Sequence, residues 1–434
     1  MYMEKNLKLN ESLNILTRFA LSHPKVIHKI SRMANYNDEP KIYTYVAYYE
    51  TGNNNNSNSS SGTSFNQRRA LIKVLGEATE RYCLNFVEEK NLITSNISML
   101  KAPYLDPLKI PSFSKHQLLS KSFKRFVFNE NTKFKWIEGY SLIEKKRVLI
   151  PAQLVFTYYT PLPNEPCIRF PISTGAASHT SFKKALYTGI CEIVERDSFM
   201  IYYLNRIPAP LVDIRSIPNK SLKRILPLLD RYKLALTVFD MTTDLQIPVY
   251  VSILLDKTGN GPAVSIGLKA GFNALNTLVG AIEESLMVRT WIRDKFIYGS
   301  TSFKMPKTIK TIDQRAYFWF KPDTIAYLNF LFKSKNVKKL EEMNINDNEY
   351  FEKIKQLFKR ANLDIYYVDV TQKEIKNAGF TVLKVFIPEL FPLYFDEKYP
   401  YNGISRLYHV PVKLGIFKKP KTESELNRIP HPVL

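Results

Sequence analysis

The chain has few cysteines, no long apolar run and no glycine-rich phosphate loop. Its 434 residues include only three cysteines, Cys83, Cys167 and Cys191. None lies in a Cys-x-x-Cys pair, so neither a disulfide framework nor a zinc site is indicated. No apolar stretch approaches the roughly 20 residues that span a bilayer, and the first residues are too polar for a secretory signal. We therefore expect a cytoplasmic protein with no membrane segment.

The composition is that of a folded, strongly basic protein. Hydrophobic residues make up 45% of the chain, and 26 Tyr and 27 Phe argue against general disorder. The formal net charge of +22 has three explanations: nucleic acid, an acidic peptide or protein partner, or a Lys- and Asn-rich bias. Because the basic residues are spread along the chain without a nucleic-acid module, we do not expect nucleic acid as the partner. Steering of an acidic partner stays a hypothesis.

A repeated acidic signature stands out in this basic chain. Glu77-Ala78-Thr79-Glu80-Arg81 recurs as Glu192-Ile193-Val194-Glu195-Arg196, and the two surrounding helical patterns align without a gap. A weaker third copy has Glu284 in the first carboxylate position, Met287 in the second and Arg289 near the arginine position. We interpret the three copies as an internal repeat of one structural unit.

Two carboxylates three residues apart share one helix face, where like charges repel unless a cation lies between them. Mg²⁺ takes oxygen ligands and is usually shared between one or two carboxylates and substrate phosphates. Glu77, Glu80, Glu192 and Glu195 are the predicted metal ligands. Arg81 and Arg196 would neutralise phosphate oxygens. The alternative is that these pairs are structural salt bridges.

Polar segments precede both carboxylate helices. Residues 59–64 are rich in Ser and Gly, and residues 173–181 run Ser-Thr-Gly-Ala-Ala-Ser-His-Thr-Ser. We expect each to be a loop that opens a helix, where free backbone N–H groups favour an anion.

Several motifs in a fixed order resemble the YcaO-domain family of ATP-dependent peptide-backbone cyclodehydratases. They include GEATERY at 76–82, WIEGYSL at 136–142, STGAASHTSFKKAL at 173–186, FDMTTDLQIPV at 239–249 and RLYHVPVKLG at 406–415. The resemblance implies an α+β YcaO fold, with layered α/β sandwich subdomains, ATP and Mg²⁺ as cofactors, and a YcaO domain over 62–434. Within it we expect an ATP-binding core over about 62–300, a peripheral segment over 301–375 and a C-terminal strand and tail over 376–434.

The resemblance also implies individual roles for residues of the nucleotide site. Besides the two arginines, the implied cofactor contacts are Ser173, Thr180, Ser181, Lys184, Glu284 and Arg289. Thr180 and Lys184 replace residues that some relatives carry in this loop, and Met287 replaces a usual Gln. His179 is either an acid or base, or a residue that only caps the helix or contacts the nucleotide.

The sequence ends Ile429-Pro430-His431-Pro432-Val433-Leu434, similar to the Pro-x-Pro-x-Pro tail of azoline-forming members. Proline stiffens an extended tail. By resemblance Pro430, Pro432 and Leu434 reach the active site and help to remove the proton of the substrate amide, although Leu434 stands where relatives have proline. The alternative is a disordered end.

The implied reaction converts Cys, Ser or Thr of a ribosomally made precursor peptide to thiazoline or oxazoline. A thioamide-forming enzyme and a non-catalytic scaffold are the rival readings. No leader-binding or ubiquitin-activating-like domain is evident, so we expect a separate partner that recognises the precursor leader, and we allow for a homodimer.

Local patterns predict the remaining elements. Residues 1–61 form an N-terminal extension with a helix over about 12–33, broken at Pro24, and a strand at 42–49. The Asn/Ser-rich tract at 52–61 is interpreted as a loop that either closes over the nucleotide or is a surface insertion. Further strands are expected within 134–156, 236–256 and 381–387, and the Lys- and Asn-rich segment 304–361 is expected to be peripheral.

Overall fold

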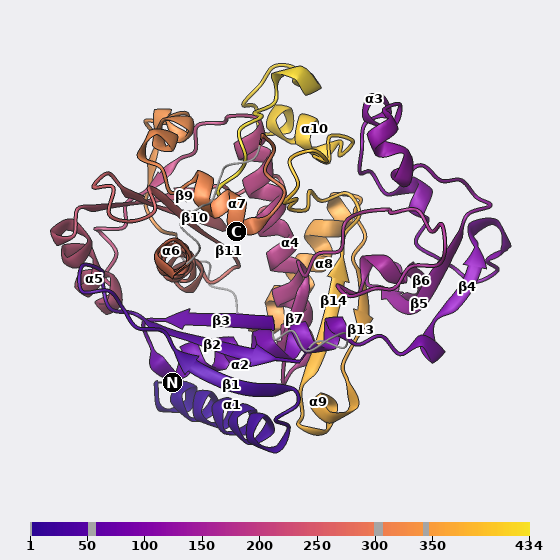
Figure 1. Cartoon of the computed structure of the whole chain (residues 1–434). Helices are drawn as coiled ribbons and strands as arrows, with labels where there is room; N and C mark the ends of the chain where they lie inside the picture. The colour runs from indigo at the N-terminus through magenta and orange to yellow at the C-terminus, as the bar shows by residue number, and fades with distance from the viewer. Residues whose placement is uncertain (1, 51–57, 299–306, 342–346) are drawn as a thin grey trace.

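Three β-sheets surround a long central helix in the computed structural model, which describes residues 2–50, 58–298, 307–341 and 347–434 (Figure 1). The central helix is α4 (Phe182–Leu204), which packs against strands of two of the sheets. Helix and sheet are layered throughout, which confirms the predicted α+β class.

The first sheet has three antiparallel strands in the order β1-β2-β3. They are β1 (Ile27–Arg32), β2 (Tyr43–Tyr49) and β3 (Asn58–Ser64). Helix α2 (Gln67–Asn85) packs on this sheet, and α1 (Tyr2–Ser22) packs on α2. Asn66 caps α2, because its side chain accepts the backbone N–H of Arg69.

The second sheet has six strands, and α4 packs on two of them, β14 and β7. Its order is β4-β5-β13-β14-β7, with β6 also paired to β5, and all its pairings are antiparallel. The strands are β4 (Ile93–Asn96), β5 (Lys133–Ser141), β6 (Lys146–Pro151), β7 (Ala176–His179), β13 (Tyr366–Asp369) and β14 (Thr381–Phe386).

The third sheet has the order β11-β10-β9-β8-β12, with only β8 and β12 parallel. The strands are β8 (Leu211–Val212), β9 (Leu234–Asp240), β10 (Val249–Asp256), β11 (Val264–Ala270) and β12 (Val337–Lys338). Helices α5 (Lys220–Arg231) and α6 (Ala274–Tyr298) pack on it. The other helices are α3 (Lys115–Leu118), α7 (Ile312–Phe318), α8 (Asp347–Arg360), α9 (Lys373–Asn377) and α10 (Arg406–Lys413).

The internal repeat is a strand followed by a long helix. Its three copies are β3-α2, β7-α4 and β11-α6, and each strand lies at one edge of its sheet. Small residues let strand and helix approach closely. A Cβ at Gly62 would lie 2.3 Å from the backbone N of Val74, and one at Gly267 would lie 2.1 Å from the carbonyl O of Ala281. In the second copy the residue aligned with Gly62 is the buried Ala177.

The predicted loops before the carboxylate helices are wrong. Residues 58–64 form β3, and residues 176–179 form β7. Their polar side chains do not prevent strand formation, because partners satisfy them: Thr63 bonds the hydroxyl of Thr44, and Ser60 donates to the carbonyl of Val74. The first residues of the Asn/Ser tract, 52–57, lie outside the described residues.

The predicted N-terminal helix over about 12–33 is correct only up to Ser22. After a turn at 24–26 the chain forms β1, which pairs with β2 from Ile27 onward. Tertiary pairing with β2 here outweighs the local helical pattern beyond Pro24. The strands expected at 42–49, within 134–156, within 236–256 and at 381–387 are all present.

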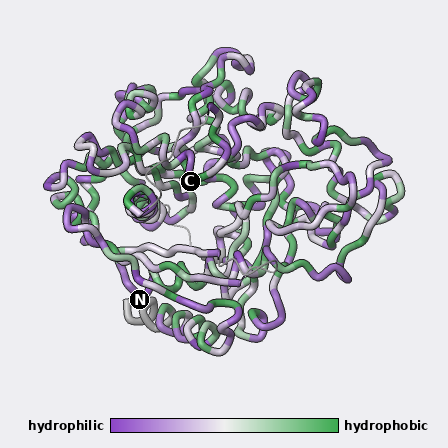
Figure 2. Tube along the Cα trace, viewed as in Figure 1, coloured by the Kyte–Doolittle hydropathy of each residue, from purple (hydrophilic) through white to green (hydrophobic). Residues whose placement is uncertain are grey.

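Hydrophilic residues recur around the whole outline of the molecule, as the purple segments of Figure 2 show. Within the described part of the chain, no helix combines the length and the apolar character needed to cross a membrane.

Candidate active site

A large pocket of about 590 Å³ lies where the three strand-helix units meet. Each helix contributes residues at the same four repeat positions. They are Lys73, Glu77, Glu80 and Arg81 from α2; Thr188, Glu192, Glu195 and Arg196 from α4; and Gly280, Glu284, Met287 and Val288 from α6. The structure therefore brings together all four predicted metal ligands and both arginines. Two walls of the pocket are charged, and the third is largely apolar.

Backbone N–H groups of β7, of β11 and of Gly175, the residue before β7, hold four of the pocket carboxylates. Ser178 and Gly175 donate to Glu80 and Glu192 at 2.7 and 2.9 Å. Ala270 and Leu268 donate to Glu195 and Glu284 at 3.2 and 2.8 Å. These bonds fix the orientation of each carboxylate before any ligand binds.

Contacts between units close a ring around the pocket. The carboxylate of Glu80 on α2 accepts a bond from β7, and that of Glu195 on α4 accepts one from β11. At the same repeat position on α6, the sulfur of Met287 accepts a bond from the hydroxyl of Ser61 on β3 at 3.1 Å. Each helix thus contacts the strand of the next unit.

Two of the pocket glutamates, Glu80 and Glu195, have raised pKa values. Burial, reinforced by the charge of Glu77, raises the pKa of Glu80 to about 8. Burial likewise raises the pKa of Glu195 to about 8, although Arg196 and Lys269 oppose the shift. A divalent cation would supply the charge that keeps both groups ionised at neutral pH.

Arg196 carries buried donors that the protein leaves without an acceptor. Its Nε and Nη1 atoms have no hydrogen-bond partner among the described residues. Its distances to the carboxylates of Glu192 and Glu195 are 3.7 and 3.6 Å, beyond hydrogen-bond length. An orphaned, buried guanidinium beside carboxylates fits a phosphate group, which would accept these bonds.

The carboxylates do not form a metal cage from protein atoms alone. Across the part of the chain that the structure describes, no three His, Cys, Asp or Glu side chains are grouped closely enough to hold a metal ion. This agrees with the way in which Mg²⁺ is bound beside nucleotides, through one or two carboxylates and the phosphates themselves.

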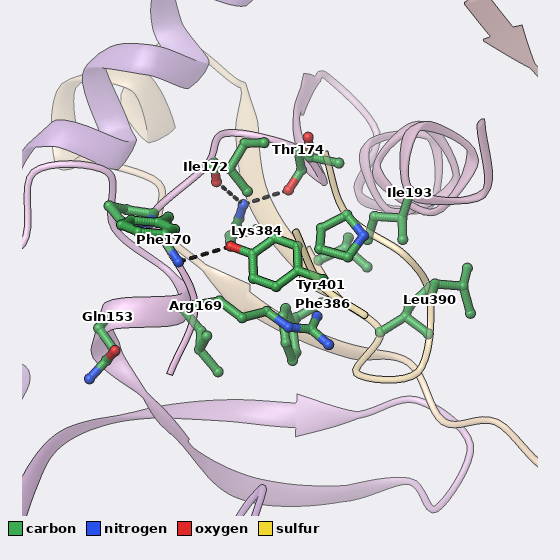
Figure 3. A pocket seen from close by; sticks show the side chains of 15 residues that line it. Gln153, Arg169, Phe170, Ile172, Thr174, Ile193, Lys384, Phe386, Leu390 and Tyr401 are labelled. Carbon is green, nitrogen blue, oxygen red and sulfur yellow. Dashed lines mark hydrogen bonds between the residues drawn. The ribbon is translucent and has the colours of Figure 1, made fainter. Parts of the chain in front are cut away.

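A second, smaller cavity (Figure 3) shares the segment 172–174 with the large pocket. Ser173 lines the large pocket, while its neighbours Ile172 and Thr174 line the small cavity. The buried ammonium of Lys384 donates to the carbonyls of Ile172 and Thr174 at 2.6 and 2.5 Å, as the dashed lines in Figure 3 show. Lys384 therefore braces the segment that places Ser173.

Other predicted cofactor residues lie away from the pocket. Thr180, Ser181 and Lys184 are not among the residues that line it. Thr180 precedes Ser181, the N-cap of α4, and Lys184 lies in the first turn of that helix. The Nδ1 atom of His179 accepts the backbone N–H of Ser181 at 2.9 Å.

Arg289 does not line the pocket. It is buried in salt bridges to Glu39 and Asp256, at 3.0 and 2.8 Å. At the arginine position of the third unit the pocket is instead lined by Val288. Arg289 lies one residue beyond that position and therefore points to a different side of α6.

The C-terminal tail is ordered and reaches the pocket. Leu434 lines it, whereas Pro430 and Pro432 lie behind this residue and outside the lining. His431, Pro432 and Val433 are buried, so the alternative of a disordered end is wrong.

Sequence reasoning missed several pocket residues. Thr188 could have been predicted from the repeat, since it aligns with Lys73. Lys269 and Trp291 belong to the third unit and Ile312 begins α7, and none of them is part of the repeated acidic signature. Ile312 also shows that the segment predicted as peripheral, 301–375, contributes to the site through α7.

The family model described as YcaO cyclodehydratase, ATP- and Mg²⁺-binding, matches residues 61–391. The chain belongs to the YcaO family. It is thus a member of an ATP- and Mg²⁺-binding cyclodehydratase family, which confirms the cofactors expected from the sequence.

Solved YcaO-type structures share this fold. A heterocyclase in complex with substrate and cofactor has a TM-score of 0.81 at 21% identity, covering 97% of this chain and 57% of that one. The YcaO protein of Methanopyrus kandleri, bound with AMPPCP and Mg²⁺, has a TM-score of 0.64 at 15% identity, covering 91% of this chain and 94% of that one. This chain therefore spans little more than half the length of the heterocyclase.

A curated relative gives no activity. An uncharacterized protein of Methanothermobacter thermautotrophicus is 23% identical over 276 residues, which cover 60% of this chain and 66% of the relative.

Proposed function

We propose that this YcaO protein uses ATP and Mg²⁺ to activate backbone amides of a ribosomally made precursor peptide, and converts Cys, Ser or Thr to thiazoline or oxazoline. The observation that carries the proposal is the buried guanidinium of Arg196, whose Nε and Nη1 lack acceptors among the described residues although Glu192 and Glu195 lie beside it. It supports a bound phosphate chain in the pocket that these residues line.

The proposed reaction has two balanced steps. The substrate side chain releases its thiol or hydroxyl proton to solvent as its sulfur or oxygen attacks the preceding carbonyl carbon. The resulting oxyanion then takes the γ-phosphoryl group of ATP, and ADP leaves. The amide nitrogen then loses its proton, and the former carbonyl oxygen departs with phosphate as the C=N bond forms. The peptide loses the elements of water, and ATP becomes ADP and phosphate.

The chain's own residues would position the reactants and stabilise charge. Glu77, Glu80, Glu192 and Glu195 would hold Mg²⁺, which supplies charge neutralisation at the phosphates. Arg81 and Arg196 would donate to phosphate oxygens, and Lys269 on β11 would add a further cation to the pocket. The tail that ends in Leu434 would help to remove the amide proton.

A separate protein would deliver the peptide. A chain with a similar fold is part of the E. coli microcin synthetase McbBCD complex with pro-MccB17 bound. By analogy we propose that a leader-binding or ubiquitin-activating-like partner in the cytoplasm presents the precursor to this chain.

The test uses the chain with the candidate precursor and partner encoded beside it. We expect Mg²⁺-dependent formation of ADP and loss of the mass of one water per modified residue. Glu192→Gln should lower both by at least about 100-fold, since a pocket charge is lost. Glu138→Gln is the matched control, because Glu138 is exposed on β5 and, within the described ranges, forms an ion pair with the exposed Arg147 alone.

Two outcomes would overturn the proposal. Exchange of oxygen for sulfur, seen as a mass gain when sulfide is supplied, would make the chain a thioamide-forming enzyme. Peptide binding without ATP turnover would make it a scaffold.

A further inference from the structure

Two helices supply hydrogen bonds that hold the first residue of the tail. The carbonyl oxygen of Pro430 accepts a bond from the hydroxyl of Tyr203 at 3.0 Å and one from the indole Nε1 of Trp319 at 3.1 Å. Tyr203 lies on α4, and Trp319 is the residue that ends α7. A proline carbonyl with two donors is fixed in both position and direction.

Arg315 holds the next residue of the tail. Its fully buried guanidinium donates from Nη1 to the carbonyl of His431 at 2.7 Å. Its Nη2 donates to the carboxylate of Glu397 at 2.7 Å and to the carbonyl of Phe395 at 3.0 Å. The guanidinium is thus anchored by the carboxylate of Glu397, while its Nη1 donates to the tail.

These contacts set the tail against the walls of the pocket. Tyr203 lies eight residues, just over two turns, after Glu195 on α4. Beyond the held carbonyls, Leu434 packs against the small cluster of Val288 and Ile292 on α6 and Ala316 on α7, and it lines the pocket. The tail is therefore tied at one end to the helix that carries the second-wall carboxylates, and at the other end it meets the third wall.

We propose that Tyr203, Arg315 and Trp319, the tail clamp, are positioning residues that fix Leu434 at the pocket. The inference rests on the proposed function, in which the tail acts on the substrate amide. None of the three lines the pocket. The clamp therefore acts through the tail and not on the nucleotide.

The first test measures docking of the tail in the full chain without substrate. Tyr203→Phe combined with Trp319→Phe removes both donors to Pro430 and keeps aromatic rings in the core. We expect hydrogen exchange at the amides of Val433 and Leu434 to accelerate roughly 5- to 30-fold, as about 1 kcal/mol is lost per bond. The control is Tyr202→Phe, a buried neighbour on α4 whose hydroxyl makes no hydrogen bond to the tail among the described residues.

The second test measures the reaction. The double variant should lower kcat for water loss toward that of a chain ending at Ile429, with the KM for ATP within about twofold of wild type. In the shortened chain the same substitutions should not lower kcat further, because truncation and substitution both abolish the placement of the tail at the pocket. Arg315→Lys, which keeps a charge beside Glu397, should show the same pattern.

The outcomes separate the clamp from the proposed function. Unchanged exchange, or losses that add in the shortened chain, would overturn the clamp and assign these residues a purely structural role. If the wild-type chain modifies no peptide, the proposed function fails, and the exchange measurement still decides whether the clamp holds the tail.

Discussion

At the scale of single residues, Lys384 is a buried cation held by carbonyl oxygens. Within the described residues its ammonium meets two carbonyls and forms no salt bridge. Burial lowers its pKa to about 7. A folded pKa below the unfolded value of about 10.4 means that the unfolded chain binds the proton more tightly above pH 7. The contribution of Lys384 to stability therefore rises as the pH rises from 7 toward 10.

Lys384→Met should remove this pH dependence. We expect the free energy of unfolding of wild type, relative to that of Lys384→Met, to increase by about 2 kcal/mol between pH 7 and pH 9. Urea unfolding at the two pH values measures it. Lys376→Met, at an exposed position on α9, should keep the wild-type profile. Identical profiles for Lys384→Met and wild type would show that the ammonium is not titrating in this range.

The carboxylates of the site were predictable because the sequence repeats them. Glu77 and Glu192 occupy equivalent positions on helices whose periodicity is evident, and a gapless alignment places them together. Arg315 was not predictable in the same way. Its partners, His431 and Glu397, are 116 and 82 residues away in sequence, so only the fold shows what it holds.

At the scale of elements, the close approach of β3 to α2 depends on Gly62. Any Cβ there would collide with the backbone of α2, which cannot move aside as a flexible side chain would. The same close approach recurs at Gly267 between β11 and α6. A glycine on the strand is thus what lets these units bring carboxylate helices to the pocket.

Gly62→Ala should lower the free energy of unfolding by about 1–3 kcal/mol, because overpacking forces a backbone shift. Gly76→Ala offers a matched comparison with the opposite sign. Gly76 lies within α2, where an added Cβ meets nothing within 4 Å, so alanine should stabilise the helix by up to about 1 kcal/mol. Chemical denaturation of both variants checks the pair, and equal stabilities would contradict the packing argument.

Strands with alternating or β-branched residues were predicted correctly, whereas polar strands were not. The sequence Asn58–Ser64 has the composition of a linker, yet it forms β3 between β2 and α2. Its strand character comes from seven register partners on β2 and from small residues that fit under a helix. Neither property is local to the segment.

At the scale of the whole molecule, the net charge of +22 should guide an acidic peptide to the pocket. We expect raising NaCl from about 0.05 to 0.5 M to weaken binding of an acidic precursor leader by roughly tenfold or more, mainly through slower association. Stopped-flow binding measures both rates. A leader with its Asp and Glu replaced by Asn and Gln should lose most of the salt dependence, and salt-insensitive binding of the acidic leader would remove this role for the charge.

The ring of contacts around the pocket also bears on how the protein folds. The contact that closes it joins Ser61 to Met287, 226 residues apart, and Glu195 gains its backbone partner from Ala270, 75 residues further on. Contacts of such long sequence separation form late, after much loop-closure entropy has been lost. A chain in which only the first two units have folded would therefore expose unpaired carboxylates in an open groove, and nucleotide binding should appear only in the last folding phase.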